Sequence, residues 1–283
     1  MPARQLLRSA LLTACVLAAV AVVPAMALAD TATSSNWAGY AAHRAGVTFR
    51  HVSASWVQPA ATCQNGQNTY SSFWVGLGGY SSHATGLEQI GSGLDCSASG
   101  QRHSFAWYEL VPAPARPTGM SVKQGDHLTA SVTVVGHQVT LRLRDRTRGE
   151  SFSKRLTTQS IDVTSAEWIA EAPSACNDVG FCEGLPLANF GAANFAGGRA
   201  QTATGQQGAI AGPAWDHTRI VLTQGASPFT GLDTDRSATP SALQRRGKAF
   251  VVRYGEHPAV GPGAARASAA STTGALQPGG PRR

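Results

Sequence analysis

The stretch HLTASVTVVGHQVTLRLRD, residues 127–145, alternates between apolar and polar side chains on both sides of a glycine. Because residues two apart on a β-strand share a face, each half would present one apolar face. These faces would consist of Leu128, Ala130, Val132 and Val134 in the first half, and of Val139, Leu141 and Leu143 in the second. Gly136 and His137 between the halves are a turn signal. The stretch therefore predicts an antiparallel hairpin with one buried and one polar face.

Similar short alternating segments fill the chain from residue 36 to 254, and helical periodicity is almost absent. Aromatic and β-branched residues predict strands over 47–59, 69–79, 103–112, 151–157, 165–172, 187–195, 218–223 and 248–254. Many strands without crossover helices favour an all-β sandwich of two antiparallel sheets. Because no internal repeat is present, a propeller or solenoid is not expected. Residues 224–246 are expected to form a long loop.

The first 29 residues have the pattern of a secretory signal peptide. Arg4 and Arg8 precede an apolar run at residues 10–23, and the run is followed by a small-x-small site that ends at Ala29. The competing interpretation is a retained membrane anchor, which usually lacks this exit pattern. We therefore expect cleavage after Ala29 and a secreted, extracellular protein.

The last segment, residues 257–283, is composed mainly of Ala, Gly, Pro and Ser. It holds too little apolar surface to offset the entropy of ordering its chain. We expect a disordered tail there, so that residues 30–256 form the single folded domain.

Loss of the signal would remove Cys15 and leave four cysteines, at positions 63, 96, 176 and 182. In an exported chain four cysteines indicate two disulfides with three possible connectivities. Cys176 and Cys182 bracket a short segment and can close a small loop, so we expect the pairs 63–96 and 176–182. The spacing does not fit a zinc site.

The whole chain has 23 Lys and Arg against 16 Asp and Glu, a net charge of +7. Without Arg4 and Arg8 there remain 21 against 16, a net charge of +5. This excess is not clustered on any recognisable helix, and no nucleic-acid-binding motif is present. The sequence therefore predicts no nucleic-acid partner, and the charge is interpreted as favouring solubility.

Common catalytic motifs are absent from the sequence: there is no G-x-S-x-G, no H-E-x-x-H and no glycine-rich phosphate loop. An enzyme built from this chain would have to use carboxylates and amides. One such candidate is AEWIAEAP, residues 166–173, where Glu167, Ile169 and Glu171 would share a strand face. Taken alone, this pattern is typical of an edge strand with one solvated face.

Two other stretches carry comparable groups. FWVGLGGYSSHATGLEQIG contains Trp74 on one strand and Gln89 on the next, and FAWYELVPAP places Trp107 and Glu109 on one face. Each has a structural explanation when taken singly. A buried glutamine can serve as a hydrogen-bonding core residue, and a Trp-x-Glu face can simply be half-buried.

Taken together and in this order, the motifs resemble the glutamic peptidases, also called eqolisins or peptidase family G1. The resemblance runs over about 160 residues, through SNWAGY (35–40), ASWVQP (54–59), FWVGLGG, LEQIGSGLDC, AWYELVP, AEWIAEAP and LANFGAANF. It implies a concanavalin-like β-sandwich with a substrate groove, and an endopeptidase that acts at acidic pH. Gln89 and Glu171 match the catalytic pair of the family, and Trp74, Trp107 and Glu109 match positions that line its active site.

Those residue types suit peptide hydrolysis. An ionised Glu171 could take a proton from the attacking water and return it to the leaving amine, and the Gln89 amide could donate to the developing oxyanion. Glu109, if it lies close to Glu171, would raise one of the two pKa values. No metal or cofactor is required, the substrates would be proteins or peptides, and a monomer is expected.

The chain departs from the family in two places. Gly78, in the substrate-binding region, stands where the fungal members carry an aspartate, which is expected to move the pH optimum upward. SNWAGY also begins only six residues after the predicted cleavage point, which leaves no room for the long propeptide of the fungal enzymes.

Two other functions remain open on the sequence alone. A secreted sugar-binding module could use the same sandwich, with Trp56, Trp74 and Trp107 stacking on sugar rings. A glycosidase could use Glu109 and Glu171 as its carboxyl pair, separated by either ~5.5 Å or ~6.5–9.5 Å.

Overall fold

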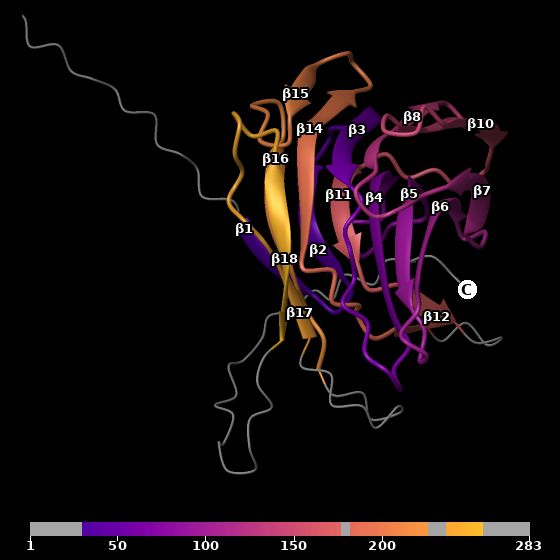
Figure 1. The fold of residues 1–283 in the computed structure, drawn as a ribbon. Helices are drawn as coiled ribbons and strands as arrows, with labels where there is room; N and C mark the ends of the chain where they lie inside the picture. The colour runs from indigo at the N-terminus through magenta and orange to yellow at the C-terminus, as the bar shows by residue number, and fades with distance from the viewer. Residues whose placement is uncertain (1–29, 177–181, 226–235, 257–283) are drawn as a thin grey trace, which may run out of the picture.

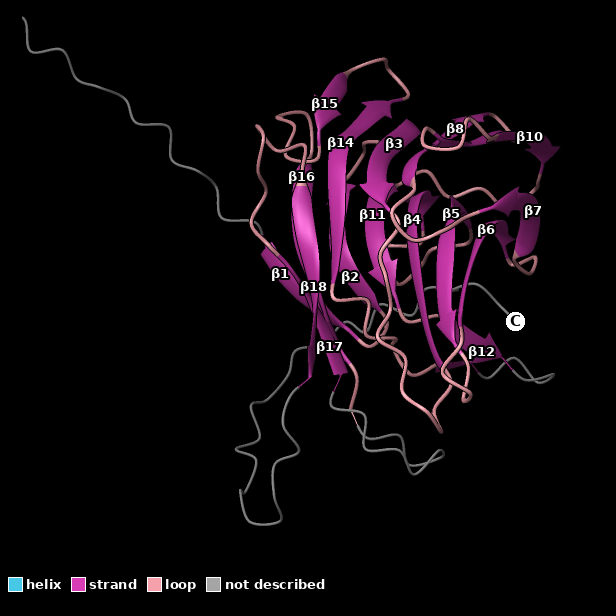
Figure 2. Ribbon diagram, in the orientation of Figure 1, coloured by secondary structure: helices cyan, strands magenta, loops and turns pink. Residues whose placement is uncertain are grey.

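The computed structural model describes residues 30–176, 182–225 and 236–256. Within these residues every regular element is a β-strand, as Figure 2 shows. The strands are β1 (Asp30–Ser34), β2 (Trp37–His43), β3 (Phe49–Val57), β4 (Thr69–Gly78), β5 (Leu87–Cys96), β6 (Arg102–Val111), β7 (Arg116–Ser121), β8 (His127–Val135), β9 (Gln138–Asp145), β10 (Ser151–Thr157), β11 (Ser165–Glu171), β12 (Ser174–Cys176), β13 (Cys182–Gly184), β14 (Ala192–Thr202), β15 (Gln207–Ala209), β16 (Asp216–Thr223), β17 (Arg236–Pro240) and β18 (Phe250–Glu256). The predicted all-β fold is confirmed.

The strands form a sandwich of two packed layers. The first layer contains β2, β11, β4, β5, β6 and β7 in that order, and Figure 1 shows several of these strands side by side. The second layer contains β10, β9, β8, β3 and β14, and its strands β3, β8 and β9 pack against β4, β5 and β11. Hydrogen bonds through β18, β17 and β16 join the two layers into one continuous path. Neighbouring strands along that path are antiparallel, whereas β1 runs parallel to β16.

The hairpin predicted at 127–145 is present as β8 and β9, with Gly136 in the left-handed region at φ +57°. Its predicted apolar faces are buried in the core between the layers. That core also holds large aromatic side chains from both layers, among them Trp56, Trp168, Phe195 and Phe250. Burial of this apolar surface is the main free-energy term that holds the layers together.

The edge-strand interpretation of AEWIAEAP is wrong. Strand β11 lies in the middle of the first layer, paired with β2 on one side and β4 on the other, and all seven of its residues are buried. Trp168 and Ala170 point into the core between the layers, while Ile169 packs on the outer face of the first layer. Both faces of the strand are covered, so alternation here does not separate buried from solvated residues.

Several segments differ from the sequence prediction. The segment expected as a long loop at 224–246 contains β17, which pairs with β16 and β18, whereas residues 226–235 lie outside the described part. The strand expected at 187–195 begins only at Ala192, and the strands β1, β2, β7, β12, β13 and β15 were not predicted. These segments lack an alternating apolar pattern, and their strand geometry comes from the hydrogen bonds of their neighbours.

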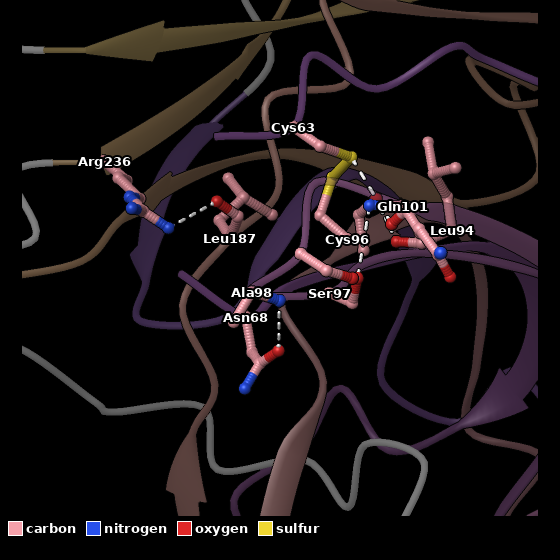
Figure 3. The surroundings of a disulfide bond; sticks show 11 residues. Cys63, Asn68, Leu94, Cys96, Ser97, Ala98, Gln101, Leu187 and Arg236 are labelled. Carbon is pink, nitrogen blue, oxygen red and sulfur yellow. Dashed lines mark hydrogen bonds between the residues drawn. A yellow bond between two sulfur atoms is a disulfide. The ribbon is translucent and has the colours of Figure 1, made fainter. Parts of the chain in front are cut away.

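The disulfide Cys63–Cys96 is present, as predicted, with a Cα–Cα distance of 5.3 Å (Figure 3). The turn that follows Cys96 is closed by Ser97 and Asn68, which accept from the amides of Gln101 and Ala98. Cys182 is also disulfide-bonded, and Cys176 is its partner in the β12–β13 ladder. The Cys176 side chain lies outside the described part, so the second pairing stays a prediction.

The predicted signal peptide and tail, residues 1–29 and 257–283, also lie outside the described part. The described residues contain no helix that is long and apolar enough to cross a membrane.

Candidate active site

A second apolar cluster covers the outer face of the first layer. We call this surface the tryptophan face; its fully buried members are Trp37, Ala41, Trp74, Leu87, Trp107, Ile169 and Ile220. The ladders align Ile169, Trp74, Gly91 and Trp107 in one row across β11, β4, β5 and β6. These residues are distant in sequence, but they are direct partners across neighbouring strands, so their side chains lie side by side on one face of the sheet. The polar candidate residues lie in the rows on either side of it.

Glu171 lies in the row on one side of the tryptophans and is fully buried. Its Oε2 accepts a hydrogen bond of 2.7 Å from the indole Nε1 of Trp74. Its Oε1 accepts from the Trp37 indole Nε1 at 3.2 Å and from the Asn36 side-chain amide at 3.4 Å. Three N–H donors therefore converge on one carboxyl group, which is the arrangement expected where a negative charge has to be held.

The pKa of Glu171 is raised to about 8. Burial is the largest cause, because it removes water from the charged form, and the nearby Glu109 carboxyl raises the pKa further. The hydrogen bonds from Trp74, Trp37 and Asn36 act in the opposite direction. The donors thus offset part of the cost of burial, so Glu171 can gain and lose a proton near neutral pH.

Gln89 lies in the row on the other side of the tryptophans, and it is also fully buried. Its side-chain Nε2 donates a hydrogen bond of 2.7 Å to Oε2 of Glu109, its direct partner in the β5–β6 ladder. This bond fixes the orientation of the amide. Glu109 therefore lies beside Gln89 and within electrostatic range of Glu171.

Trp74 connects the two rows. Its indole N–H binds Glu171, while its ring lies over Gly76, where an added Cβ would come within 2.9 Å of Cζ3. Gly76 is the β4 partner of Gln89. The four candidates from the sequence thus form one cluster, which consists of Trp74, Gln89, Glu109 and Glu171. Trp107 lies on β6 at the end of the tryptophan row, which separates the row of Glu171 from the row of Gln89. The indole N–H of Trp107 has no hydrogen-bond partner within the described residues.

Asn36 and Trp37 are functional candidates that the sequence analysis did not single out. Trp37 is the ladder partner of Glu171 on β2, and its ring meets Trp74 edge to face at 5.0 Å. Both residues belong to SNWAGY, which was noted only as part of the family pattern. The buried Glu171 carboxyl needs hydrogen-bond donors from a strand next to β11. The sequence alone does not show that β2 is that neighbouring strand.

Gly78 contributes only backbone to this region. It adopts φ +83°, and an added Cβ would lie 2.5 Å from the Asp162 carbonyl oxygen. Asp162 is buried, and its carboxylate accepts from Gly79 N at 3.4 Å and from Thr164 N at 2.9 Å. A carboxylate from the loop before β11 therefore lies next to Gly78. The predicted role of Gly78 in substrate binding stays a prediction.

Two more buried carboxyls lie near Asp162. Glu167 and Glu88 are fully buried, and none of their four side-chain oxygens has a hydrogen-bond partner within the described residues. Burial raises the pKa of Glu88 to about 8 and that of Glu167 well above its usual value. Asp162 raises both pKa values further. Both groups are therefore neutral carboxylic acids at acidic pH.

The tryptophans do not form a sugar-stacking surface. Trp56 points into the core between the layers, and Trp74 and Trp107 are at most 2% exposed. A sugar ring needs an accessible aromatic face to stack on, so this arrangement does not support the sugar-binding alternative. Within the described residues, no group of three or more His, Cys, Asp or Glu side chains is arranged to hold a metal ion.

Comparisons with known proteins agree with this geometry. The Peptidase A4 family matches residues 35–255, which is most of the chain. The crystal structure of scytalido-glutamic peptidase with a transition state analog inhibitor is 26% identical, with a TM-score of 0.62, covering 78% of this chain and 98% of that one. The structure of SCP-B, a member of the Eqolisin family, with the tripeptide Ala-Ile-His is 24% identical with a TM-score of 0.60 over the same shares. At 24% identity, the similarity to SCP-B is evidence for the fold alone.

The comparison with curated proteins gave no match. The family match extends from β2 to β18 and includes every member of the cluster around Trp74. It decides against the glycosidase interpretation as well as the sugar-binding one. The chain therefore belongs to the Peptidase A4 family and is a glutamic endopeptidase, an enzyme that acts on protein or peptide substrates.

Proposed function

We propose that Glu171 and Gln89 form the catalytic dyad of this peptidase, with Glu171 as general base and acid and Gln89 as the oxyanion donor. The observation that carries the proposal is the buried Glu171 carboxyl, on which three N–H donors converge. A buried carboxyl that has both a raised pKa and oriented donors is the kind of group expected at a catalytic centre.

In the first step, ionised Glu171 takes a proton from a water molecule as the water oxygen attacks the scissile carbonyl carbon. The carbonyl π electrons move to the oxygen, and the Gln89 amide donates a hydrogen bond to this oxyanion. In the second step, protonated Glu171 gives its proton to the amide nitrogen, the C–N bond breaks and the carbonyl re-forms. The base contributes about 10²–10⁴-fold and the oxyanion donor about 10²–10³-fold.

Glu109 is assigned a positioning role. It accepts a hydrogen bond from the Gln89 side-chain amide, which holds that amide in place as the donor that we assign to the oxyanion. Because glutamine does not titrate in the working range, this donor keeps its role at every pH. Both dyad side chains are buried, so a peptide has to displace the partly exposed residues that pack at the rim of the tryptophan face, such as Tyr80 and Val111.

The pH dependence follows from two opposing requirements. Acid favours departure of the amine, because an amine leaves more readily once it is protonated. The base role requires ionised Glu171, and with a pKa of about 8 the ionised fraction falls roughly tenfold for each pH unit below that value. We therefore propose activity at weakly acidic rather than strongly acidic pH.

The proposed location is extracellular, with residues 1–29 as a cleaved signal. The support for this is the signal pattern itself and the disulfide Cys63–Cys96, since such bonds persist in oxidising compartments. We propose that the mature enzyme works as a monomer.

The test compares Glu171→Gln with Glu167→Gln in digestion of a denatured protein between pH 2 and 7. The two residues share one face of one strand and are equally buried, so the substitutions are closely matched. We expect Glu171→Gln to lower kcat by about 10²-fold or more at every pH, while Glu167→Gln stays near wild type. The opposite result would assign the base role to Glu167. Wild-type rates for both variants would refute the dyad.

A further inference from the structure

The outer face of the second layer lies on the opposite side of the sandwich from the tryptophan face. Its side chains form three rows that cross β10, β9, β8, β3 and β14. The rows are Ser153–Arg142–Ser131–Ser53–Arg199, Ser151–Arg144–Thr129–Ser55–Ala196 and Arg155–Thr140–Thr133–His51–Gln201. We call this surface the arginine face. Serine and threonine provide eight of its fifteen positions, arginine provides four, and no position is acidic.

The four arginines are exposed, and none of them forms an ion pair with another described residue. The ion pairs of the described residues are Arg44–Asp216 and Arg148–Glu150, and neither involves the arginine face. Electrostatic repulsion is evident at His51, whose pKa is lowered by burial first and then by Arg142 and Arg50. Like charges gathered without counter-charges oppose folding, so this arrangement suits a surface that binds an anionic partner.

The face also has a shape that can hold a chain. A trough of about 330 Å³ crosses β8, β9 and β10. One wall is formed by Thr129, Arg144 and Ser151, and the other by Ser131, Arg142 and Ser153; Ala130, Leu143 and Phe152 line the trough between them. Each wall therefore carries one guanidinium between two hydroxyl groups. Arg142 and Arg144 start about 7 Å apart on their strand, since each residue advances it by roughly 3.4 Å.

The side chains of the two walls determine which kind of partner the trough can bind. Guanidinium groups bind phosphate oxygens in a two-pronged geometry, and hydroxyl groups donate to the same oxygens. His51 is the one aromatic ring in the three rows, and Phe152, which lines the trough, already stacks on Tyr108. The series of rings on which the bases of single-stranded nucleic acids stack is therefore not present in the three rows. The hydroxyls already bond across strands, Ser55 to Thr129 at 3.1 Å and His51 to Thr133 at 2.8 Å, which makes the surface between the arginines rigid.

We propose that the arginine face binds a linear phosphate-rich polyanion, which holds the enzyme on an anionic polymer with its tryptophan face directed away. Binding on one outer face of a sandwich leaves the other outer face accessible. The peptidase would then remain active on soluble substrates while it is bound. This proposal does not depend on which residues carry out catalysis.

The test measures binding to long-chain inorganic polyphosphate as a function of salt. Arg142→Ser/Arg144→Ser is compared with the control Arg102→Ser/Arg116→Ser, which removes the same charge from exposed positions on β6 and β7. We expect the first variant to lose tenfold or more in affinity and to show a shallower dependence of log Kd on log salt, because fewer counterions are released. The control should bind within a factor of about three of wild type, and both variants should cleave a short soluble peptide at wild-type rates.

Three outcomes would overturn the proposal. Equal losses in the two variants would mean that only net charge matters. Inhibition of peptide cleavage by polyphosphate, competitive with the peptide, would place the polyanion on the tryptophan face. Binding to vesicles rich in phosphatidylglycerol, without binding to polyphosphate, would assign the face to a membrane surface instead.

Discussion

The two ends of β11 carry the same side chain in very different surroundings. Glu171 and Glu167 point to the same side of the strand, and both are fully buried. Glu171 accepts hydrogen bonds from Trp74, Trp37 and Asn36, whereas neither oxygen of Glu167 has a partner within the described residues. Burial raises both pKa values; the nearby Ser165 hydroxyl lowers that of Glu167, whereas three N–H donors lower that of Glu171.

The comparison teaches that burial by itself does not make a carboxyl catalytic. A general base has to be ionised for part of the time, and in a buried site this requires oriented donors. Glu167 lacks them and remains a neutral acid over a wide pH range. The donors of Glu171 come from β4, from β2 and from Asn36 just before β2, so the difference between the two ends arises from the neighbouring segments.

The largest effect is expected at Gln89, the proposed oxyanion donor that acts together with Glu171. Gln89→Ala should lower kcat by about 10²–10³-fold, because it removes the oxyanion donor. The acid limb of the pH–rate profile should keep its apparent pKa, since the titrating group Glu171 is still present.

The control for this substitution is Gln58→Ala, which removes another buried glutamine. Gln58 bonds Ser92 and the Gly93 carbonyl oxygen on the core side of β5. It should lower the thermal midpoint and leave kcat near wild type. A shift of the acid limb in Gln89→Ala would show that Gln89 acts on the protonation of Glu171 instead.

A smaller effect is expected when one donor of Glu171 is removed. Trp74→Phe deletes the 2.7 Å hydrogen bond, so the pKa of Glu171 should rise further and less of it is ionised at weakly acidic pH. A hydrogen bond to a charged group is worth about 1.5–3 kcal/mol, which corresponds to a loss of roughly tenfold to 100-fold in kcat/KM on the acid limb.

Trp168→Phe is the matched control for Trp74→Phe. The Trp168 indole donates to the Ser53 carbonyl oxygen at 3.0 Å and points into the core, away from Glu171. Its pH–rate profile should be unchanged, although the protein is less stable. If Trp168→Phe moved the acid limb as far as Trp74→Phe does, the Trp74 donor would have no specific role.

At the other end of β11, Glu167→Gln should change kcat by less than about threefold and should alter the pH dependence of stability instead. Because the folded pKa of Glu167 lies well above 4.5, the folded protein retains a proton that the unfolded chain has lost. The free energy of unfolding therefore falls as the pH rises from 4.5 to the folded pKa of Glu167. The total decrease is about 1.4 kcal/mol for each unit by which the folded pKa exceeds the unfolded one.

Urea unfolding at pH 4 and at pH 8 measures this effect. Glu167→Gln should have a smaller difference in unfolding free energy between the two pH values than wild type has. Glu150→Gln, at a partly exposed carboxylate paired with Arg148, is the control and should keep the wild-type difference. An unchanged difference in Glu167→Gln would mean that this carboxyl titrates normally in the folded protein.

The smallest effect is expected from chelation. The proposed reaction uses only side-chain groups, so incubation with EDTA should leave the cleavage rate unchanged at each pH. A rate that is lost in EDTA and restored by added zinc would require a metal ion in the reaction, and the difference between the two ends of β11 would then need another explanation.

The sequence predicted much of this architecture and the main candidates at the site. Alternation in 127–145 was sufficient for the β8–β9 hairpin, and the order of the motifs indicated the family and its candidate residues. The strand β17 and the start of β14 were missed, because they have no distinct periodicity and are held by neighbouring strands. Trp74 was singled out, but the other two donors to Glu171, Asn36 and Trp37, were missed because they lie 135 and 134 residues away in the chain.

By itself the sequence determined the fold class and the residue types available for chemistry, because alternation and local motifs are encoded over short distances. Only the tertiary structure decided which buried carboxyl receives donors and that arginines from β9, β10 and β14 share one face. Strand order and register are set by packing between distant segments. A net charge that looks dispersed along the chain can therefore be concentrated on one surface, and two similar glutamates on one strand can differ in function.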